Sequence, residues 1–205
     1  MKCAGVILAG GLSRRMDGRE KAMIPLGDQP LIAHVIERLR PQVSDMAINA
    51  NGDAARFDAF GLPVAGDVVG GHAGPLAGVL TGLRWAAGLS GVTHIATVAT
   101  DTPFFPTDLV AALAGAGDDP CEIRLAGSGG HRHPVFGLWP LGIADSLETF
   151  LQEQETRKVM AFVQQHPWQT VDFGSAVPQG LDPFFNINTP EDLAVAEAHR
   201  RQYGG

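Results

Sequence analysis

Short apolar runs alternate with helical patterns through the first hundred residues, and this alternation constrains the fold more than any other feature. Residues 4–8 form a continuous apolar run that ends in glycine, as a fully buried parallel strand does. Apolar residues three and four positions apart predict helices over 31–39 and 76–88. Further strands are predicted at 46–49, 62–65 and 94–99. The pattern predicts a three-layer, Rossmann-like α/β fold, with helices on both faces of a mainly parallel sheet.

The second half is less regular but carries further elements. We expect a strand at 133–140, helices at 143–154 and 156–165, and a short strand at 168–172. A last helix begins sharply, with Thr189 as N-cap, Pro190 at the first helical position and acidic residues in the first turn. Because there is no internal repeat and no long linker, residues 1–205 are predicted to form one domain.

Charge and cysteine content exclude several classes of protein. The 205 residues carry a net charge of −7, which argues against general binding to nucleic acid or to an anionic membrane surface. No apolar run approaches the ~18 residues that span a bilayer. The run from Cys3 to Ala9 is short for a signal peptide and is interpreted as the first strand, so we expect a cytoplasmic protein. Cys3 and Cys121 are expected to be reduced, buried thiols.

Positive charge is concentrated after the first predicted strand, in the segment "LAGGLSRRMDGREK" at 8–21. Gly10 and Gly11 lack Cβ atoms, so their backbone N–H groups can approach a polyphosphate closely. The cations available to neutralise phosphate are Arg14, Arg15, Arg19 and Lys21. The segment is neither a P-loop nor a GxGxxG fingerprint. The alternative is a solvated turn with surface cations.

Two carboxylates follow predicted strands. Asp101 stands at a strand end before Thr-Pro and is a candidate Mg²⁺ ligand, because Mg²⁺ favours one or two carboxylates together with phosphate oxygens. Asp67 follows the strand at 62–65 and is a candidate of the same kind. For each, the alternative is a turn or helix-capping aspartate. The glycine-rich segment 66–78 is predicted to be a mobile loop that faces the site.

Two asparagine pairs have a spacing of two residues, Asn49 with Asn51 and Asn186 with Asn188. In extended chain each pair points to one face. Amides both donate and accept hydrogen bonds, as the edge of a base requires, although turn residues are the alternative. His131 and His133 are also two apart but lack an evident third ligand, so we expect substrate-side or surface residues rather than zinc ligands. Exposed cations are the alternative to a phosphate-binding role for Arg132, Arg157 and Lys158.

Several motifs together resemble the molybdenum cofactor guanylyltransferase (MobA-like) family of nucleotidyltransferases, which transfer GMP from GTP to molybdopterin. They are "LAGGLSRRM", Lys21, "PLAG" at 75–78, "DTP" at 101–103, "HPVFGL" at 133–138, "RKV" at 157–159 and "FNINTPEDL" at 185–193. They cover nearly the whole chain in the family's order, and the first and last are the most specific. The resemblance implies a nucleotidyltransferase fold, GTP and molybdenum-molybdopterin as substrates, and Mg²⁺ as cofactor.

The resemblance also implies roles for individual residues. Leu8, Ala9 and Gly10 match the backbone that contacts the nucleotide, and Lys21 matches the lysine on its phosphates. Asn49 and Asp67 match guanosine contacts, and Asp101 matches the carboxylate shared by GTP and Mg²⁺. Other functional positions of the family fall on Gly11, Arg15, Gly78, Asn186 and Asn188. Residues 1–105 are thus expected to bind GTP and Mg²⁺, and residues 106–205 molybdopterin.

The chain departs from the family's usual pattern at Asp17, where glycine is common, and at Glu20, where aspartate precedes the lysine. The implied mechanism is in-line attack by the terminal phosphate of molybdopterin on the α-phosphate of GTP. Because this nucleophile is already an anion, no general base is required. Catalysis then depends on the positive field of Arg15, Lys21 and the Asp101-bound metal.

Two alternative functions are weighed against this one. The first is a related nucleotidyltransferase with another base or acceptor, such as a cytidylyltransferase or a sugar-phosphate enzyme. The second is a non-catalytic nucleotide-binding module, which has no need of Lys21 and Asp101. Transient contacts with proteins that make or accept the molybdenum cofactor are expected, and the enzyme is expected to be a monomer.

Overall fold

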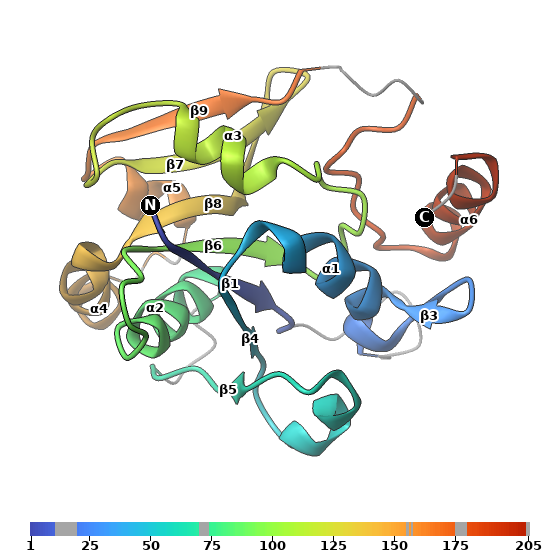
Figure 1. The fold of residues 1–205 in the computed structure, drawn as a ribbon, viewed down its shortest axis with the longest axis horizontal. Helices are drawn as coiled ribbons and strands as arrows, with labels where there is room; N and C mark the ends of the chain where they lie inside the picture. Colours follow the sequence, from blue (N-terminus) through green and yellow to red (C-terminus); the bar gives the residue numbers. More distant parts are fainter. Residues whose placement is uncertain (11–19, 70–73, 155, 157, 175–179, 204–205) are drawn as a thin grey trace.

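The computed structural model describes residues 1–10, 20–69, 74–154, 156, 158–174 and 180–203. Within them the chain forms a seven-stranded sheet in the order β5-β4-β1-β6-β8-β7-β9 (Figure 1). All neighbouring pairs are parallel except the two made by β8, which runs antiparallel to β6 and β7. The predicted mainly parallel α/β sheet is confirmed. The strands are β1 (Cys3–Leu8), β4 (Asp45–Asn49), β5 (Val64–Ala65), β6 (His94–Ala99), β7 (Ile123–Ser128), β8 (His131–Pro140) and β9 (Trp168–Asp172).

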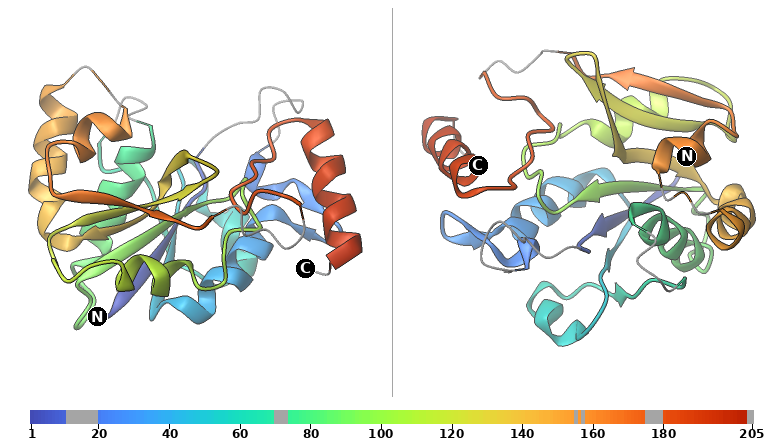
Figure 2. Two further views of the ribbon diagram at one scale, coloured as in Figure 1. Left: turned by 90° about the horizontal axis from the view of Figure 1, so that it is seen from above. Right: turned by 180° about the vertical axis from the view of Figure 1, so that it is seen from behind.

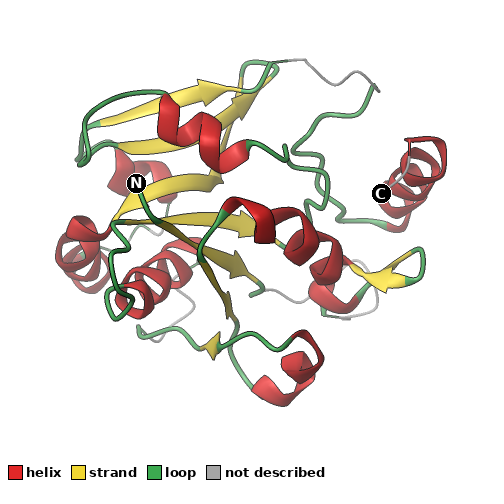
Figure 3. Cartoon of the chain, in the orientation of Figure 1, coloured by secondary structure: helices red, strands yellow, loops and turns green. Residues whose placement is uncertain are grey.

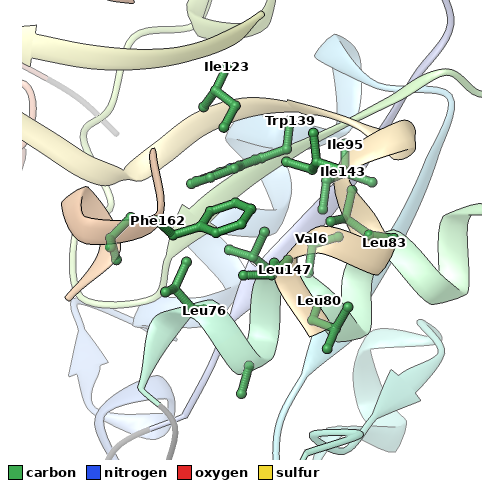
Figure 4. Close-up of a cluster of buried hydrophobic side chains, with 14 of the residues drawn as sticks. Val6, Leu76, Leu80, Leu83, Ile95, Ile123, Trp139, Ile143, Leu147 and Phe162 are labelled. Carbon is green, nitrogen blue, oxygen red and sulfur yellow. The ribbon is translucent and has the colours of Figure 1, made fainter. Parts of the chain in front are cut away.

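Helices cover both faces of this sheet, as Figures 2 and 3 show. They are α1 (Leu31–Leu39), α2 (Pro75–Ala86), α3 (Leu109–Gly115), α4 (Ala144–Glu153) and α5 (Val159–Val163), whereas a further helix, α6 (Pro190–Tyr203), packs elsewhere. Side chains alternate along β1, so Ala4 and Val6 pack with α2, α4 and α5, whereas Cys3 and Ile7 pack with α1 and α3. Figure 4 shows the first of these two cores, in which Trp139 and Phe162 lie over the apolar face of α2.

A third, smaller apolar cluster holds α6 against a hairpin rather than against the sheet. The hairpin strands are β2 (Pro25–Leu26) and β3 (Gln29–Pro30), and Leu26 and Leu31 pack with Ala196 of α6. The predicted start of α6 is confirmed: the N–H of Asp192 donates to the Thr189 hydroxyl, and the Asp192 carboxylate accepts from the N–H of Thr189. This reciprocal pairing is a capping box, and it also fixes the preceding Asn188.

Four short 3₁₀ helices complete the described secondary structure: η1 (Lys21–Met23), η2 (Arg40–Gln42), η3 (Ala54–Phe60) and η4 (Leu141–Ile143). The predicted helix at 156–165 is shorter than expected, because Lys158 has an extended backbone and α5 begins only at Val159. The predicted loop at 66–78 also ends early, since Pro75 is the first residue of α2 and Gly78 therefore lies inside a helix. No described helix is long and apolar enough to cross a membrane.

The two cysteines differ in environment. Cys3 is buried, as predicted, and burial raises the pKa of its thiol to about 12. The prediction for Cys121 is wrong, because this residue is exposed. It lies in the turn before β7, where its N–H donates to the Asp119 carboxylate, and it belongs to neither core.

Candidate active site

A pocket of about 600 Å³ opens at the carboxyl ends of the parallel strands. In open α/β sheets this edge is where ligands bind, because the loops after neighbouring strands meet there. Four successive strands of the sheet contribute to it: β1 through Leu8 and Gly10, β4 through Asn49 and Asn51, β5 through Asp67, and β6 through Ala99, Thr100 and Asp101. The opposite wall comes from β8, through residues 132–136.

Two asparagines after β4 brace the carboxylate of Asp67. The amide of Asn49 donates to one carboxylate oxygen at 2.9 Å, and that of Asn51 donates to the other at 2.8 Å. The side-chain oxygen (Oδ1) of Asn51 in turn accepts from the backbone N–H of Asp67 at 2.8 Å. The predicted convergence of Asn49 and Asn51 is therefore present, but their N–H groups are directed at Asp67. The carboxylate of Asp67 is held in one orientation at the pocket surface.

Gly78 acts behind this network and is not among the residues that line the pocket. A Cβ atom at Gly78 would lie 2.3 Å from the side-chain oxygen (Oδ1) of Asn49 and 2.7 Å from a methyl group of Leu8. Glycine at this position of α2 therefore lets Asn49 occupy its place beside Asp67. At Gly10, by contrast, a Cβ atom would meet no described atom within 4 Å, so the room beside this backbone is open.

The ammonium group of Lys21 lies between two acceptors from distant segments. It is 3.0 Å from the Asp101 carboxylate and also donates to the side-chain carbonyl of Asn188. The partners Lys21 and Asp101 are 22% and 21% exposed, so the pair is partly shielded from water without being sealed from the pocket. Asp101 is thereby placed with one oxygen toward Lys21, while its other oxygen accepts from Thr102 at 3.2 Å.

The segment at 186–188 reaches this site because it pairs with the strand end. The N–H of buried Ile187 donates to the Asp101 carbonyl at 2.8 Å, which directs the flanking asparagines to the same region. Asn186 accepts from the Thr102 hydroxyl and lines the pocket, whereas Asn188 contacts Lys21. Both asparagines therefore hold other site residues in place, a role that spacing alone does not distinguish from binding a base.

Glu20, where the chain departs from the family's usual aspartate, is directed at Arg56. The Arg56 Nε atom donates to the Glu20 carboxylate at 2.8 Å, and the same guanidinium donates to the backbone carbonyls of Asn51, at 2.6 Å, and Asp53. It also lies 4.6 Å from the centroid of the Phe57 ring. One guanidinium thus links the residue before Lys21 to the turn that carries Asn51.

The structure brings most of the predicted site residues together. Those that line one pocket are Leu8, Gly10, Lys21, Asn49, Asp67, Asp101 and Asn186. Ala9 is buried beside them, and its N–H donates to the Asn49 carbonyl at 2.9 Å. Gly11, Arg15 and the departure Asp17 lie outside the described residues, as does Arg157. Lys158 is exposed and does not line the pocket, whereas Arg132 does.

Sequence reasoning missed a second polar group, on the β8 side of the pocket. The Ser128 hydroxyl forms a hydrogen bond of 2.7 Å with Nε2 of His133. It also donates to the two carboxylate oxygens of Asp182, which lie 3.0 and 2.8 Å away. Burial lowers the pKa of His133, against the opposing effect of the Asp182 carboxylate. The signal in the sequence was the Asp-Pro turn at 182–183, although nothing in its spacing connects it to Ser128. His131 is exposed, and no cluster of three potential metal ligands exists among the described residues.

Comparison with known proteins agrees with the fold. The structure of molybdopterin-guanine dinucleotide biosynthesis protein A from Archaeoglobus fulgidus superposes with a TM-score of 0.71 at 24% identity, over 97% of this chain and 99% of that one. A 4-diphosphocytidyl-2C-methyl-D-erythritol synthase from Anaerococcus prevotii gives 0.73 at 11% identity, over 98% and 96%. Residues 5–170 match the model of the MobA-like NTP transferase domain, so the class of the protein is that of the nucleotidyltransferases.

Sequence relatives define the family within that class. The chain is 49% identical to the molybdenum cofactor guanylyltransferase of Mesorhizobium japonicum, over 94% of this chain and 93% of the relative. It is 46% identical to that of Cereibacter sphaeroides, over 98% and 99%. The chain belongs to the MobA-like family of molybdenum cofactor guanylyltransferases. The resemblance inferred from the motifs is confirmed.

Proposed function

We propose that this enzyme transfers GMP from GTP to the terminal phosphate of molybdenum-molybdopterin, releasing pyrophosphate and forming the guanine dinucleotide form of the cofactor. The observation that carries the proposal is the convergence of the Lys21–Asp101 pair and the braced Asp67 carboxylate on one pocket. The names of relatives close to half identical over nearly the whole chain support the choice of guanylyl transfer.

The guanosine part of GTP is assigned to the end of the pocket formed by β1, β4 and β5. An ionised carboxylate accepts hydrogen bonds only, and the guanine edge offers adjacent N–H donors, so the braced Asp67 suits this base. Asn49 acts with Asp67, and Gly78 acts through Asn49. The backbone of Leu8, Ala9 and Gly10 is assigned to the nucleotide contact, together with Gly11, which follows in the sequence.

The phosphates are assigned to the Lys21–Asp101 end. Lys21 exchanges Asp101 and Asn188 for phosphate oxygens when GTP binds, and Arg15 supplies a second positive charge. The donor set fits a divalent metal that arrives with the nucleotide, because Asp101, the pocket carboxylate beside Lys21, leaves most coordination positions to phosphate oxygens and water. We propose Mg²⁺ as this ion, and when bound it would neutralise charge on the triphosphate and on the leaving pyrophosphate.

The chemistry asks little of the protein beyond position and charge. The attacking phosphate is an anion, so no side chain has to remove a proton. The barrier arises because two anionic groups must meet, and it is lowered by fixed positive charge that needs no rearrangement in the transition state. The Lys21 ammonium, which Asn188 holds at the pocket before GTP binds, supplies part of that field.

The acceptor is assigned to the β8 side of the pocket, where Arg132 and Asn186 stand. This division gives residues 1–105 to GTP and the metal and residues 106–205 to molybdopterin, within a single domain. We further propose a cytoplasmic monomer that makes transient contacts with the proteins that supply molybdopterin or receive the product.

The decisive experiment compares GTP, CTP, ATP and UTP for pyrophosphate release that depends on molybdenum-loaded molybdopterin, in the presence of Mg²⁺. We expect release with GTP and detection of the guanine dinucleotide by mass spectrometry. A preference for CTP, or turnover with a sugar phosphate as acceptor, would instead support a related nucleotidyltransferase. GTP binding in calorimetry without turnover on any acceptor would indicate a non-catalytic module.

A further inference from the structure

A buried serine connects a histidine of the pocket wall to an aspartate behind it. Ser128 is 1% exposed, and its hydroxyl lies 2.7 Å from Nε2 of His133 and 2.8 Å from the nearer oxygen of Asp182. His133 lines the pocket on the β8 side, facing the end assigned to the acceptor. The arrangement differs from a nucleophilic triad, because the serine rather than the histidine is the central group and is closed off from the pocket.

Counting protons in this group fixes the state of the histidine. A serine hydroxyl carries one proton, and an ionised carboxylate can only accept, so Ser128 donates to Asp182. The Ser128 oxygen must then accept from His133, which requires a proton on Nε2. In the neutral ring this leaves a lone pair on Nδ1. No hydrogen bond to Nδ1 from another described residue accompanies the one at Nε2.

The ring is also held against rotation. It stacks on Phe184 with centroids 4.4 Å apart and planes inclined by 22°, and Phe184 in turn packs against Phe136 and Phe173. The Asp182 carboxylate accepts from the N–H of Phe184 at 2.7 Å, so the aspartate and the stacking ring are placed together. The burial that lowers the pKa of His133 favours its neutral form.

The backbone of β8 explains why this side chain faces the pocket. Leu125 of β7 pairs with Gly137, but the next residue, Ala126, pairs with His133, so residues 134–136 of β8 lie between consecutive pairs. Such irregularities redirect side chains and are common beside active sites. The carbonyl of Val135, within the irregular stretch, accepts from the buried Thr97 hydroxyl at 2.6 Å.

We propose that Ser128 and Asp182 hold His133 in its Nε2–H tautomer, so that Nδ1 accepts a hydrogen bond from an N–H donor of the acceptor substrate. His133 is then a specificity-determining residue for the acceptor, and the matching chemistry is a heteroaromatic ring that carries amino or ring N–H groups, as a pterin does. The inference rests on the proposed function for the identity of the acceptor, while the tautomer itself depends only on the protein.

The tautomer is tested first, by ¹⁵N NMR of histidine-labelled protein, with His133 assigned by its loss in His133→Gln. We expect a protonated Nε2 and an unprotonated Nδ1. Asp182→Asn provides a second check: an amide nitrogen in place of the carboxylate oxygen nearer to Ser128 donates to the serine and weakens the acceptor on that side, which favours donation from the serine to the histidine. The proton should move to Nδ1. A protonated Nδ1 in the unaltered enzyme would overturn the proposal.

The role in recognition is tested by the Michaelis constants of the two substrates. In His133→Gln a side-chain amide can keep the contact with Ser128, but the Nδ1 acceptor is lost. We expect KM for molybdopterin to rise by about tenfold, the size of one well-placed hydrogen bond, with a much smaller change in KM for GTP. Asp182→Asn should also raise KM for molybdopterin, because a protonated Nδ1 cannot accept a hydrogen bond from the substrate. The exposed His131→Gln is the matched control and should change neither constant.

The outcomes separate the two proposals. An unaltered enzyme that forms no guanine dinucleotide overturns the proposed function and the acceptor named here. An active enzyme whose KM for molybdopterin stays within about twofold in both His133→Gln and Asp182→Asn overturns the inference alone. If Asp182→Asn fails to fold, the His133→Gln and His131→Gln pair still decides the question.

Discussion

The two ends of the pocket are built in different ways. At the end proposed to bind the nucleotide, called the nucleotide end, polar side chains come from the carboxyl ends of four adjacent parallel strands and bond to one another, as Asn49 and Asn51 do to Asp67. At the β8 side of the pocket, proposed to bind the acceptor and called the acceptor end, consecutive residues of one antiparallel strand line the wall. The pairing of β8 with β7 is irregular there. One end depends on the general geometry of α/β sheets, and the other on one local distortion.

This difference indicates which contacts a substitution will disturb. A substitution among the groups that brace one another at the strand ends should alter binding of the nucleotide. A substitution among the groups that support the β8 irregularity should alter binding of the acceptor. Asp101 and Lys21 stand at the junction, because β6 is the strand that pairs with β8 on one side and with β1 on the other. The predictions below test this separation of the two ends.

The largest effect is expected at the junction. Asp101→Ala removes the pocket carboxylate assigned to the metal, and Lys21→Ala removes the ammonium group assigned to the phosphates. Each should lower kcat by roughly 10²–10³-fold, the usual loss on removing one preorganised electrostatic group. Rates are measured with both substrates saturating, and circular dichroism checks the fold. Near-normal turnover in either folded variant would refute the assignment.

At the nucleotide end, Gly78→Ala should act through Asn49. The new methyl group would lie 2.3 Å from the side-chain oxygen (Oδ1) of Asn49, so the side-chain amide must move away from Asp67. We expect KM for GTP to rise by about tenfold and stability to fall by about 1–3 kcal/mol, as for overpacked cores. Gly82→Ala, on the same helix, is the matched control, because its methyl group meets the side chain of Val6 at 2.6 Å. It should reduce stability similarly while leaving KM for GTP unchanged, and an equal loss of GTP affinity would contradict the role of Asn49.

At the acceptor end, Thr97→Val should show the opposite selectivity. The Thr97 hydroxyl donates to the Val135 carbonyl and accepts from the Trp139 indole, so valine leaves two buried groups without this partner. Stability should fall by about 2 kcal/mol, the scale of an unsatisfied buried polar group. If the folded variant is compared at a temperature where it remains native, KM for molybdopterin should rise by a fewfold without a change in KM for GTP. A change in KM for GTP alone would contradict the proposed separation of the two ends.

The same contrast explains how far the sequence predicts this molecule. The strands β1, β4 and β6 and the helices α1 and α2 have strong apolar periodicity, and the rule for carboxyl strand ends brings Gly10, Asn49 and Asp101 together. Neither α3 nor β7 was predicted, because Leu109–Gly115 is a short helix and Ile123–Ser128 a strand interrupted by small residues. The group of Ser128, His133 and Asp182 could not be predicted, since it depends on a pairing irregularity and on a contact across 54 residues.

The roles of Gly78 and Glu20 could not be predicted from the sequence, and the physical reason is the same for both. Residue type and spacing specify what a side chain can do, but its partner is set by packing. Gly78 was expected to be a functional residue, yet it does not line the pocket, and a Cβ atom in its place would collide with Asn49. Glu20 adds a negative charge next to Lys21 in the sequence, yet its carboxylate is engaged by Arg56.

The smallest effect is expected where Glu20 and Arg56 join the phosphate side to the base side of the nucleotide end. The two side chains are 22% and 26% exposed, so they stay in contact with water although partly shielded, and we expect the ion pair alone to contribute about 1 kcal/mol or less. Arg56→Lys keeps the charge but loses the fork that also reaches the Asn51 carbonyl. We expect GTP affinity, measured by calorimetry, to fall by about threefold, equivalent to ~0.6 kcal/mol.

A double-mutant cycle locates the origin of that loss. If the ion pair positions the residue before Lys21, Glu20→Ala and Arg56→Ala should be less than additive, because each removes the same contact. If Arg56 acts only through the Asn51 carbonyl, the two effects should add. Arg84→Ala is the matched control, since Arg84 pairs with Asp145 and Glu148 on the surface between α2 and α4. If the Arg84 variant lowers GTP affinity as much as the Arg56 variant does, the loss of any surface ion pair would be enough to cause the effect. The link between the phosphate and base sides would then be refuted.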